Sequence, residues 1–311
     1  MSTKRNILKR VGALALALVL LCAAALVVGA AGRDAKAEKA STLPQKAEPK
    51  TGITVYSNEK ASVDASNLAE GYIMVKYTGG KNVRIKVQIT KSGGVTYTYD
   101  LNNAGRTETF PLTEGDGTYT VKVFENTSGT KYAQAFSTSV TMTLRNDFLP
   151  FLYPNQYVNY TMDSQTVAVG AQLCTGKTDD LAKVTAVFDW VVDNFTYDYD
   201  KAATVQSGYL PVVDTVLAAR KGICFDYAAV MTAMLRSQNI PCKLVVGYAG
   251  DIYHAWINVY VEGVGWIDKA IYFDGVNWTL MDPTFTSTGN RSQSIMQYVT
   301  DKTNYTQKYA Y

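Results

Sequence analysis

Two residues of this chain have the types that thiol chemistry needs, a cysteine and the only histidine. His254 lies 30 residues after Cys224. If the protein uses an imidazole as acid or base near neutral pH, His254 has to supply it. The two side chains together favour acyl transfer through a thiol, whereas a lone histidine or cysteine is more often structural.

A helix is predicted to begin at Cys224 and to end before Ile240-Pro241. Its apolar residues recur at helical spacing and form one buried stripe: Tyr227, Val230, Met231, Met234 and Leu235. Asp226, Arg236 and Gln238 are expected to face elsewhere. A sulfur in the first turn meets backbone N–H groups and the positive end of the helix dipole. This position favours the thiolate, while a buried structural cysteine is the alternative.

Short strands are predicted after this helix, over 244–248, 254–261, 265–273 and 278–281. His254 opens the second strand, and Asp282 directly follows the fourth. Neighbouring antiparallel strands would bring these two side chains together beside the sulfur. A thiolate, a base and an orienting carboxylate need this arrangement.

Two helices are predicted upstream. The first covers 179–195, where Thr178 and Asp179 precede apolar residues at helical spacing and can cap the first turn. The second is shorter and runs from Asp214, as its cap, to Ala219. Gly222 is expected to let the chain leave this helix in a left-handed turn.

Residues 52–145 alternate between apolar and polar side chains, as in Val83 to Ile89, and glycine-rich turns separate the runs. About seven short strands at this spacing predict a β-sandwich of immunoglobulin-like type. The segment has no histidine, cysteine or tryptophan, so it is interpreted as a spacer rather than an interaction module. Tyr97, Tyr99 and Tyr119 are expected in its core rather than on a ligand platform.

The N-terminus has the layout of an export signal. Residues 1–32 combine Lys4, Arg5, Lys9 and Arg10 with an uncharged apolar stretch, which predicts a signal peptide or a membrane anchor. Leu21 disfavours a lipid anchor at Cys22. Residues 33–51 are predicted to be a disordered tether. The protein is therefore expected to be secreted or on the extracellular surface, and to meet a membrane only through the N-terminal segment.

Charge and cysteine content limit the partners. Without residues 1–31 the net charge falls from +3 to −1, which gives no electrostatic attraction to nucleic acid. Cys174, Cys224 and Cys242 remain, and a disulfide between the first and third would leave Cys224 free, although the sequence does not decide this. A single histidine and no CxxC argue against a zinc site, so no metal and no cofactor are predicted.

Several ordered blocks resemble the transglutaminase-like superfamily of papain-like thiol enzymes. They are Gly222-Ile223-Cys224-Phe225-Asp226-Tyr227-Ala228, Leu235-Arg236, Ile240-Pro241, Gly247-Tyr248, His254-Ala255-Trp256, and Trp278 followed by Asp282-Pro283-Thr284. Upstream, Lys183, Trp190-Val191 and Phe195 to Asp198 are similar to the helix that precedes the nucleophile in this family. The resemblance covers about 147–290, and several blocks in the right order make it specific.

This resemblance implies an α+β papain-like domain over 147–290 with a triad of Cys224, His254 and Asp282. Cys224 would attack a glutamine carboxamide or a peptide carbonyl, His254 would relay the proton, and Asp282 would hold the imidazole. An extra hairpin-like stretch around Asp268 makes that residue a rival third member. Asp282 is preferred because Pro283 fixes the backbone after it and its block matches better.

The expected function is that of an extracytoplasmic thiol acyl-transferase of transglutaminase-like type. An amine would resolve the thioester by cross-linking, and water would resolve it by deamidation or proteolysis. Protein or cell-wall peptide is the expected substrate, while the oligomeric state is left open. The alternative is a non-catalytic surface binding or adhesion module that retains the triad.

Two other features are left open. Trp256, Trp266 and Trp278 are candidates for the walls of an acyl-donor cleft, although at least two of them are expected to pack the sheet. Residues 291–311 are treated as a C-terminal tail of unassigned structure.

Overall fold

The computed structural model describes residues 43–249, 251–273, 278–280 and 305–311. Every element below belongs to one compact unit, residues 44–311. The predicted signal or anchor (1–32), most of the predicted tether and Asp282 lie outside the described residues. Among the described residues, no helix has the length and apolar character that a membrane span requires.

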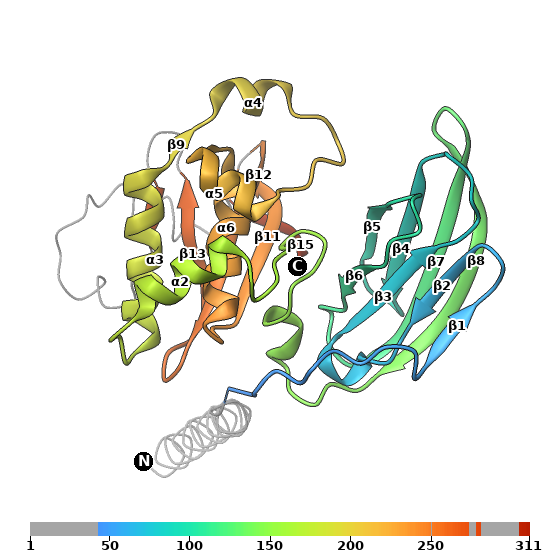
Figure 1. Ribbon diagram of the computed structural model, residues 1–311, viewed down its shortest axis with the longest axis horizontal. Helices are drawn as coiled ribbons and strands as arrows, with labels where there is room; N and C mark the ends of the chain where they lie inside the picture. Colours follow the sequence, from blue (N-terminus) through green and yellow to red (C-terminus); the bar gives the residue numbers. More distant parts are fainter. Residues whose placement is uncertain (1–42, 250, 274–277, 281–304) are drawn as a thin grey trace, which may run out of the picture. The chain divides into compact units, whose positions relative to one another are not determined.

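Eight strands and a short 3-10 helix form the N-terminal part of this unit (Figure 1). They are β1 (Val55–Ser57), β2 (Ala61–Asp64), η1 (Leu68–Glu70), β3 (Tyr72–Tyr77), β4 (Ile85–Lys91), β5 (Thr96–Leu101), β6 (Glu108–Pro111), β7 (Gly117–Ser128) and β8 (Lys131–Met142). The strands make two four-stranded antiparallel sheets, in the orders β1-β2-β3-β6 and β5-β4-β7-β8. The predicted strands are therefore confirmed, and Tyr97, Tyr99 and Tyr119 are buried in the core.

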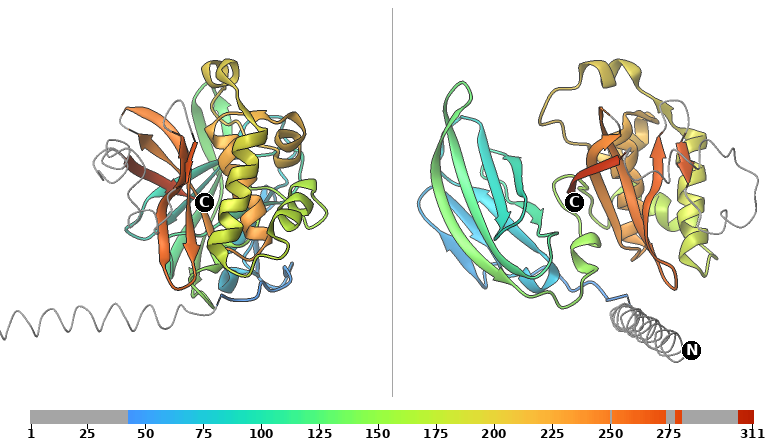
Figure 2. Two further views of the ribbon diagram at one scale, coloured as in Figure 1. Left: turned by 90° about the vertical axis from the view of Figure 1, so that its left-hand side faces the viewer. Right: turned by 180° about the vertical axis from the view of Figure 1, so that it is seen from behind.

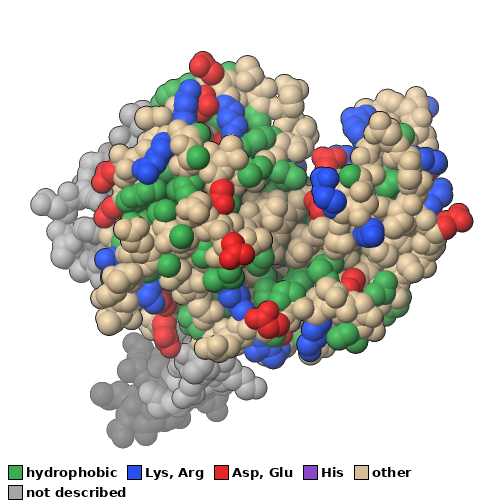
Figure 3. Space-filling view, viewed as in Figure 1, with side chains coloured by type: hydrophobic (Ala, Val, Ile, Leu, Met, Phe, Trp, Pro, Cys, Tyr) green, Lys and Arg blue, Asp and Glu red, His purple; other side chains and the backbone are tan. Residues whose placement is uncertain are grey.

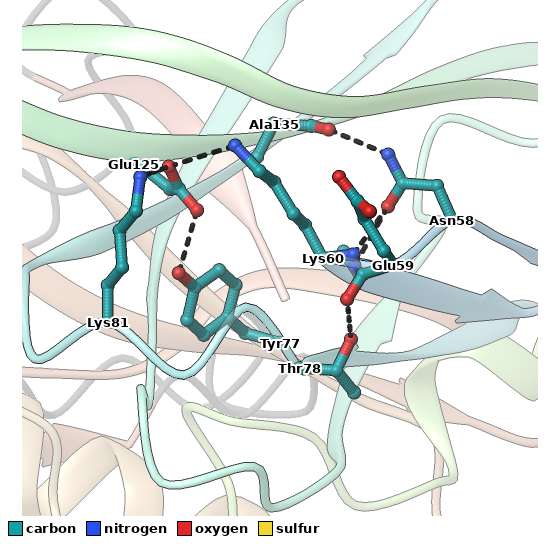
Figure 4. A network of polar contacts seen from close by, with 9 residues as sticks. Asn58, Glu59, Lys60, Tyr77, Thr78, Lys81, Glu125 and Ala135 are labelled. Carbon is teal, nitrogen blue, oxygen red and sulfur yellow. Dashed lines mark hydrogen bonds and ion pairs between the residues drawn. The ribbon is translucent and has the colours of Figure 1, made fainter.

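A buried carboxylate joins these two sheets. Glu125 on β7 accepts the hydroxyl of Tyr77 on β3 at 2.7 Å, and its other oxygen meets Lys81 at 2.7 Å and Lys60 at 3.4 Å (Figure 4). Since a buried carboxylate is costly unless it is paired and hydrogen-bonded, these three donors explain how Glu125 is accommodated there. The network fixes β3 of one sheet against β7 of the other.

The C-terminal part is α+β, as the sequence predicts. It contains η2 (Leu149–Phe151), α2 (Gln165–Cys174), α3 (Asp180–Asn194), β9 (Thr196–Tyr197), α4 (Tyr199–Thr204), α5 (Val213–Ala219), β10 (Lys221–Gly222), α6 (Cys224–Ser237), β11 (Cys242–Ala249), β12 (Ile252–Val261), β13 (Gly265–Phe273), β14 (Trp278–Leu280) and β15 (Tyr305–Ala310). Five of its strands form an antiparallel sheet in the order β14-β13-β12-β11-β15. The strand β15, drawn in red in Figure 2, lies in the segment that the sequence left unassigned.

The capping of the helices agrees only in part with the sequence prediction. Asp179 accepts the N–H of Ala182 and caps α3, as expected. Asp214 does not cap its own helix α5, because its carboxylate accepts both the N–H and the hydroxyl of Thr166 at the start of α2. The chain leaves α5 in the left-handed region at Arg220, which has a φ of 52°, and not at Gly222.

Helix α6 is buried on almost every side, and this corrects the prediction of a single buried stripe. It contacts α2, α3 and α5, and also β11 and β12 of the sheet (Figure 1). Asp226 and Arg236, both expected to face elsewhere, have no exposed surface. The guanidinium of Arg236 donates to the backbone carbonyls of Tyr153, Cys242 and Tyr311, which replace the water that the cation loses.

A second buried carboxylate lies near the start of the C-terminal part. Glu70 in η1 accepts Nε and an Nη of Arg145 at 2.9 and 2.8 Å and the hydroxyl of Tyr153 at 2.6 Å. Burial alone would raise the pKa of Glu70, but these hydrogen bonds outweigh it and lower that pKa.

Candidate active site

Cys224 is the first residue of α6, and a short strand pair fixes its approach. The parallel pairing of β9 with β10 places Tyr197 beside Gly222, two residues before the cysteine. A Cβ on Gly222 would lie 2.6 Å from that of Asp226, so glycine is required for this close approach. The N–H of Ile223 donates to the Asp226 carboxylate at 2.8 Å, which closes the helix start.

Three hydrogen-bond donors near the sulfur of Cys224 lower the pKa of its thiol. The donors are the backbone N–H groups of Phe225 and Ala255 and the hydroxyl of Tyr197. Burial raises the pKa of the thiol, and the three donors offset this only in part, so the pKa stays above its ordinary value. The expectation that this position favours the thiolate is therefore wrong, because burial raises the pKa of the Cys224 thiol by more than the nearby donors lower it.

His254 lies on β12, directly before the residue whose N–H reaches the Cys224 sulfur. It is 8% exposed and pairs across the sheet with Gly247 of β11. His254 and Cys224 line the same pocket. The structure thus brings together two of the three residues predicted for the triad, one from a helix start and one from the sheet.

The third predicted residue, Asp282, lies outside the described residues. Its rival Asp268 is described, and its carboxylate accepts the amide of Asn258 at 2.9 Å. Asn258 is four residues beyond His254 on β12, or about 13 Å at the rise of a β-strand. Asp268 is therefore engaged away from the imidazole, which leaves Asp282 as the candidate.

Tyr197 is a site residue that the sequence analysis did not single out. Its hydroxyl lies near both the sulfur and the backbone of Cys224, and these groups affect the pKa of each other. Burial, with the neighbouring thiol as the next cause, raises the pKa of Tyr197 to about 12, so its proton is retained at neutral pH. The available signal was its place within the block Phe195 to Asp198 that resembles the family.

A buried ion pair stabilises the start of α6. The Asp226 carboxylate meets Lys201 of α4 at 2.6 Å and accepts the hydroxyl of Tyr209 at 2.5 Å. The Lys201 ammonium also lies 4.2 Å from the centre of the Tyr209 ring. These contacts fix α4 and the loop that follows it, residues 205–212 (the α4 loop), to the first turn of α6.

The pocket has a volume of about 600 Å³. Residues of β4 and β5, the loop after α4, the start of α6, and strands β11, β12 and β15 line it. The surface is hollowed between the α4 loop and the strands β4 and β5 (Figure 3). A volume of this size accommodates a small molecule or several residues of a peptide.

The tryptophans do not form the walls of this pocket as far as the described residues show. Trp256 is 3% exposed, and Trp266 packs against Phe148, Phe151 and Tyr260. Neither residue lines the pocket, and the side chain of Trp278 lies outside the described part. Tyrosines and a phenylalanine take the place that the sequence analysis considered for tryptophan.

Cys174, Cys224 and Cys242 are free thiols, so the disulfide that the sequence left open is not formed. Of these three, Cys224 alone is not fully buried. Within the described ranges, no group of three His, Cys, Asp or Glu side chains is arranged to hold a metal ion. The described site offers a thiol, an imidazole and hydrogen-bond donors.

Residues 167–283 match the sequence profile of the transglutaminase-like superfamily, which confirms the resemblance predicted from the motifs. A UPF0252 protein of Methanocaldococcus jannaschii is 32% identical over 113 residues, which are 32% of this chain and 32% of that protein. Kyphoscoliosis peptidase of Mus musculus is 28% identical over 120 residues, 35% of this chain and 16% of the peptidase. The chain thus covers a third or less of the length of these relatives.

Among solved structures, a candidate cysteine protease of Cytophaga hutchinsonii aligns with 69% of this chain and 67% of its own, at 18% identity and a TM-score of 0.35. The transglutaminase of red sea bream aligns with 68% of this chain and 48% of its own, at 14% identity and a TM-score of 0.24.

Proposed function

Since residues 167–283 match the transglutaminase-like superfamily, we propose that this chain is a cysteine acyl-transferase or peptidase in which Cys224 is the nucleophile. His254 is the base and Asp282 orients the imidazole. The observation that supports this best is that Cys224, at the start of α6, and His254, the only histidine of the chain, line one pocket.

The reaction starts from a neutral thiol, because the pKa of Cys224 is raised by burial. His254 takes the thiol proton as the sulfur attacks the carbonyl carbon of a glutamine carboxamide or a peptide bond. The carbonyl oxygen becomes an oxyanion, for which the Tyr197 hydroxyl and the backbone N–H groups at the helix start are the nearby donors.

The intermediate collapses when the carbon–nitrogen bond breaks. His254 returns the proton to the leaving nitrogen, which departs as ammonia or as the amine of the cleaved peptide. A thioester remains on Cys224. An incoming amine then gives a new amide, and water gives a carboxylate, and in both cases the free thiol is restored.

We further propose that the two N-terminal sheets form an immunoglobulin-like sandwich and that the protein acts outside the cytoplasm. The first proposal is supported by two four-stranded antiparallel sheets and the core tyrosines between them. The second is supported by the export layout of residues 1–32. Protein or cell-wall peptide is the substrate class that this location suggests.

Mass spectrometry of a glutamine peptide incubated with the protein tests the proposed reaction. A mass gain equal to that of the added primary amine minus ammonia identifies cross-linking, a gain of about one mass unit identifies deamidation, and fragments identify a peptidase. Cys224→Ser and His254→Ala should each abolish the product. Cys174→Ser, which changes a buried thiol outside the pocket, is the control and should retain it.

Alkylation separates the enzyme from a non-catalytic binding module. Iodoacetamide should label Cys224 faster than the buried Cys174 and Cys242, and His254→Ala should slow that labelling. Equal and slow labelling of all three thiols, together with no peptide product, would support the binding module.

A further inference from the structure

The candidate pocket has a wall that the proposed chemistry does not need. Lys86 of β4 and Thr98 and Asp100 of β5 line it, although they belong to the N-terminal sheets. These strands carry none of the residues that handle the sulfur or the proton. This part of the chain was interpreted from its sequence as a spacer, and a spacer is not expected to line an active site.

Several contacts fix this wall against the catalytic part. The side-chain amide of Gln156 donates to the carbonyl of Asp100 at 2.5 Å, and the hydroxyl of Thr113 donates to the carbonyl of Ala310 at 2.8 Å. The ring of Tyr311 packs between the rings of Tyr97, Tyr99 and Tyr157. These contacts hold β5 against β15 and the catalytic part.

The α4 loop meets the wall on its other side. Gly208 in this loop has a φ of +90°, and a Cβ there would lie 2.8 Å from an Asp100 carboxylate oxygen. The hydroxyl of Tyr209, the next residue of this loop, donates to the Asp226 carboxylate at 2.5 Å and anchors the loop to the helix that carries Cys224. The loop therefore spans from the nucleophile to the wall, and the two are parts of one pocket.

The lining that the described residues form is aromatic and close to neutral. Tyr157, Phe225, Tyr253 and Tyr309 lie along it, and Tyr253 is 58% exposed. Apart from His254, the charged residues of the described lining are Lys86 and Asp100, which pair with each other at 2.6 Å. Such a surface favours an aromatic or large aliphatic side chain and disfavours a charged one, which would lose its water without finding a partner.

We propose that β4 and β5 form part of the acyl-donor site and select polypeptides with an aromatic or large aliphatic residue beside the reactive glutamine. This inference rests on the proposed thioester function and adds the substrate class to it. The pocket is large enough for the flanking residue as well as the reactive side chain, since one glutamine does not fill about 600 Å³.

Two capped peptides that differ only in the flanking residue test the inference, Gly-Phe-Gln-Gly-Gly and Gly-Asp-Gln-Gly-Gly. The phenylalanine peptide should have a kcat/KM higher by about tenfold or more, the order expected for burial of one large apolar side chain. Thr98→Trp should reduce this preference at least severalfold, because the larger side chain would occupy the part of the pocket beside β5. The rate of Cys224 alkylation by iodoacetamide, measured for each variant, corrects for changes in the thiol itself.

The control is Thr141→Trp. Thr141 is an exposed threonine on β8 of the same sheet, and like Thr98 it bonds a polar side chain across the strands. It does not line the pocket, so the preference should remain as in the parent. Lys86→Gln is a milder second variant that leaves Asp100 unpaired. It should raise the kcat/KM for a peptide with lysine in the flanking position relative to the parent.

The outcomes separate the inference from the proposed function. Turnover without a flank preference, or a preference that Thr98→Trp and Lys86→Gln leave unchanged, overturns the inference and leaves the function standing. If no peptide is turned over, the proposed function fails, and calorimetric binding of both peptides to Cys224→Ala decides the inference. Binding of the phenylalanine peptide that Thr98→Trp weakens supports it, and equal binding of the two peptides overturns it.

Discussion

Replacing Asp226 with asparagine should destabilise the protein more than a change of one charge suggests. The substitution removes the carboxylate that meets Lys201 at 2.6 Å and accepts the Tyr209 hydroxyl and the Ile223 N–H. An amide offers one oxygen where the carboxylate offers two, so one of these donors loses its acceptor. The charge of Lys201 also loses its partner.

The burial of Asp226 and Lys201 determines how much stability the substitution should cost. Removing one member of a buried ion pair costs about 3–5 kcal/mol. The side chain of Asp226 is fully buried, whereas that of Lys201 is 27% exposed and can turn toward water. We therefore expect the lower end, about 3 kcal/mol, which corresponds to a fall in Tm of about 6–12 °C for a unit of this size.

Urea and thermal unfolding followed by circular dichroism measure this effect. The control is Asp189→Asn, which removes the same charge from an exposed position on α3 and should change stability by about 0.5 kcal/mol or less. A double-mutant cycle with Lys201→Met isolates the pair. The reasoning is refuted if Asp226→Asn costs no more than the control, or if its effect adds fully to that of Lys201→Met.

Three further predictions concern stability and assembly. Arg236→Met leaves three buried carbonyls without their donor, so unfolding free energy should fall by about 3 kcal/mol or more, which urea titration measures. The lowered pKa of Glu70 stabilises the fold above the ordinary carboxyl range, and this contribution should disappear as pH falls through the folded-state pKa. As pH falls, Arg145→Met should lose less unfolding free energy than the parent protein does. An equal loss in both proteins would contradict the role given to the Glu70–Arg145 pair. In Gly247→Ala, the new Cβ would lie 2.0 Å from the carbonyl oxygen of Thr306, so β15 should detach and become sensitive to limited proteolysis.

The sequence predicts the elements that depend on local pattern. Alternation indicates the strands on both sides of His254, Asp179 marks the start of α3, and Cys224 is the first residue of α6 as expected. These features depend on side-chain period and on capping, which neighbouring residues determine.

The remaining features depend on partners that are distant in the chain. Asp226 and Arg236 were expected to face elsewhere because charges usually do, but Lys201 and three backbone carbonyls accommodate them in the interior. Tyr197 becomes a site residue only through the pairing of β9 with β10. The raised pKa of Cys224 reflects burial by strands and loops that no local pattern reveals.

The position of β15 in the sheet has a consequence for how the protein folds. The strand pairs with β11, which lies about sixty residues earlier, and Tyr309 of this strand and Tyr311 after it line the pocket. A contact across so long a stretch forms late, because the intervening chain must first be synthesised and brought back. Until β15 has paired with β11, the pocket lacks one of its sides. We therefore expect activity to appear only after this strand has joined the sheet.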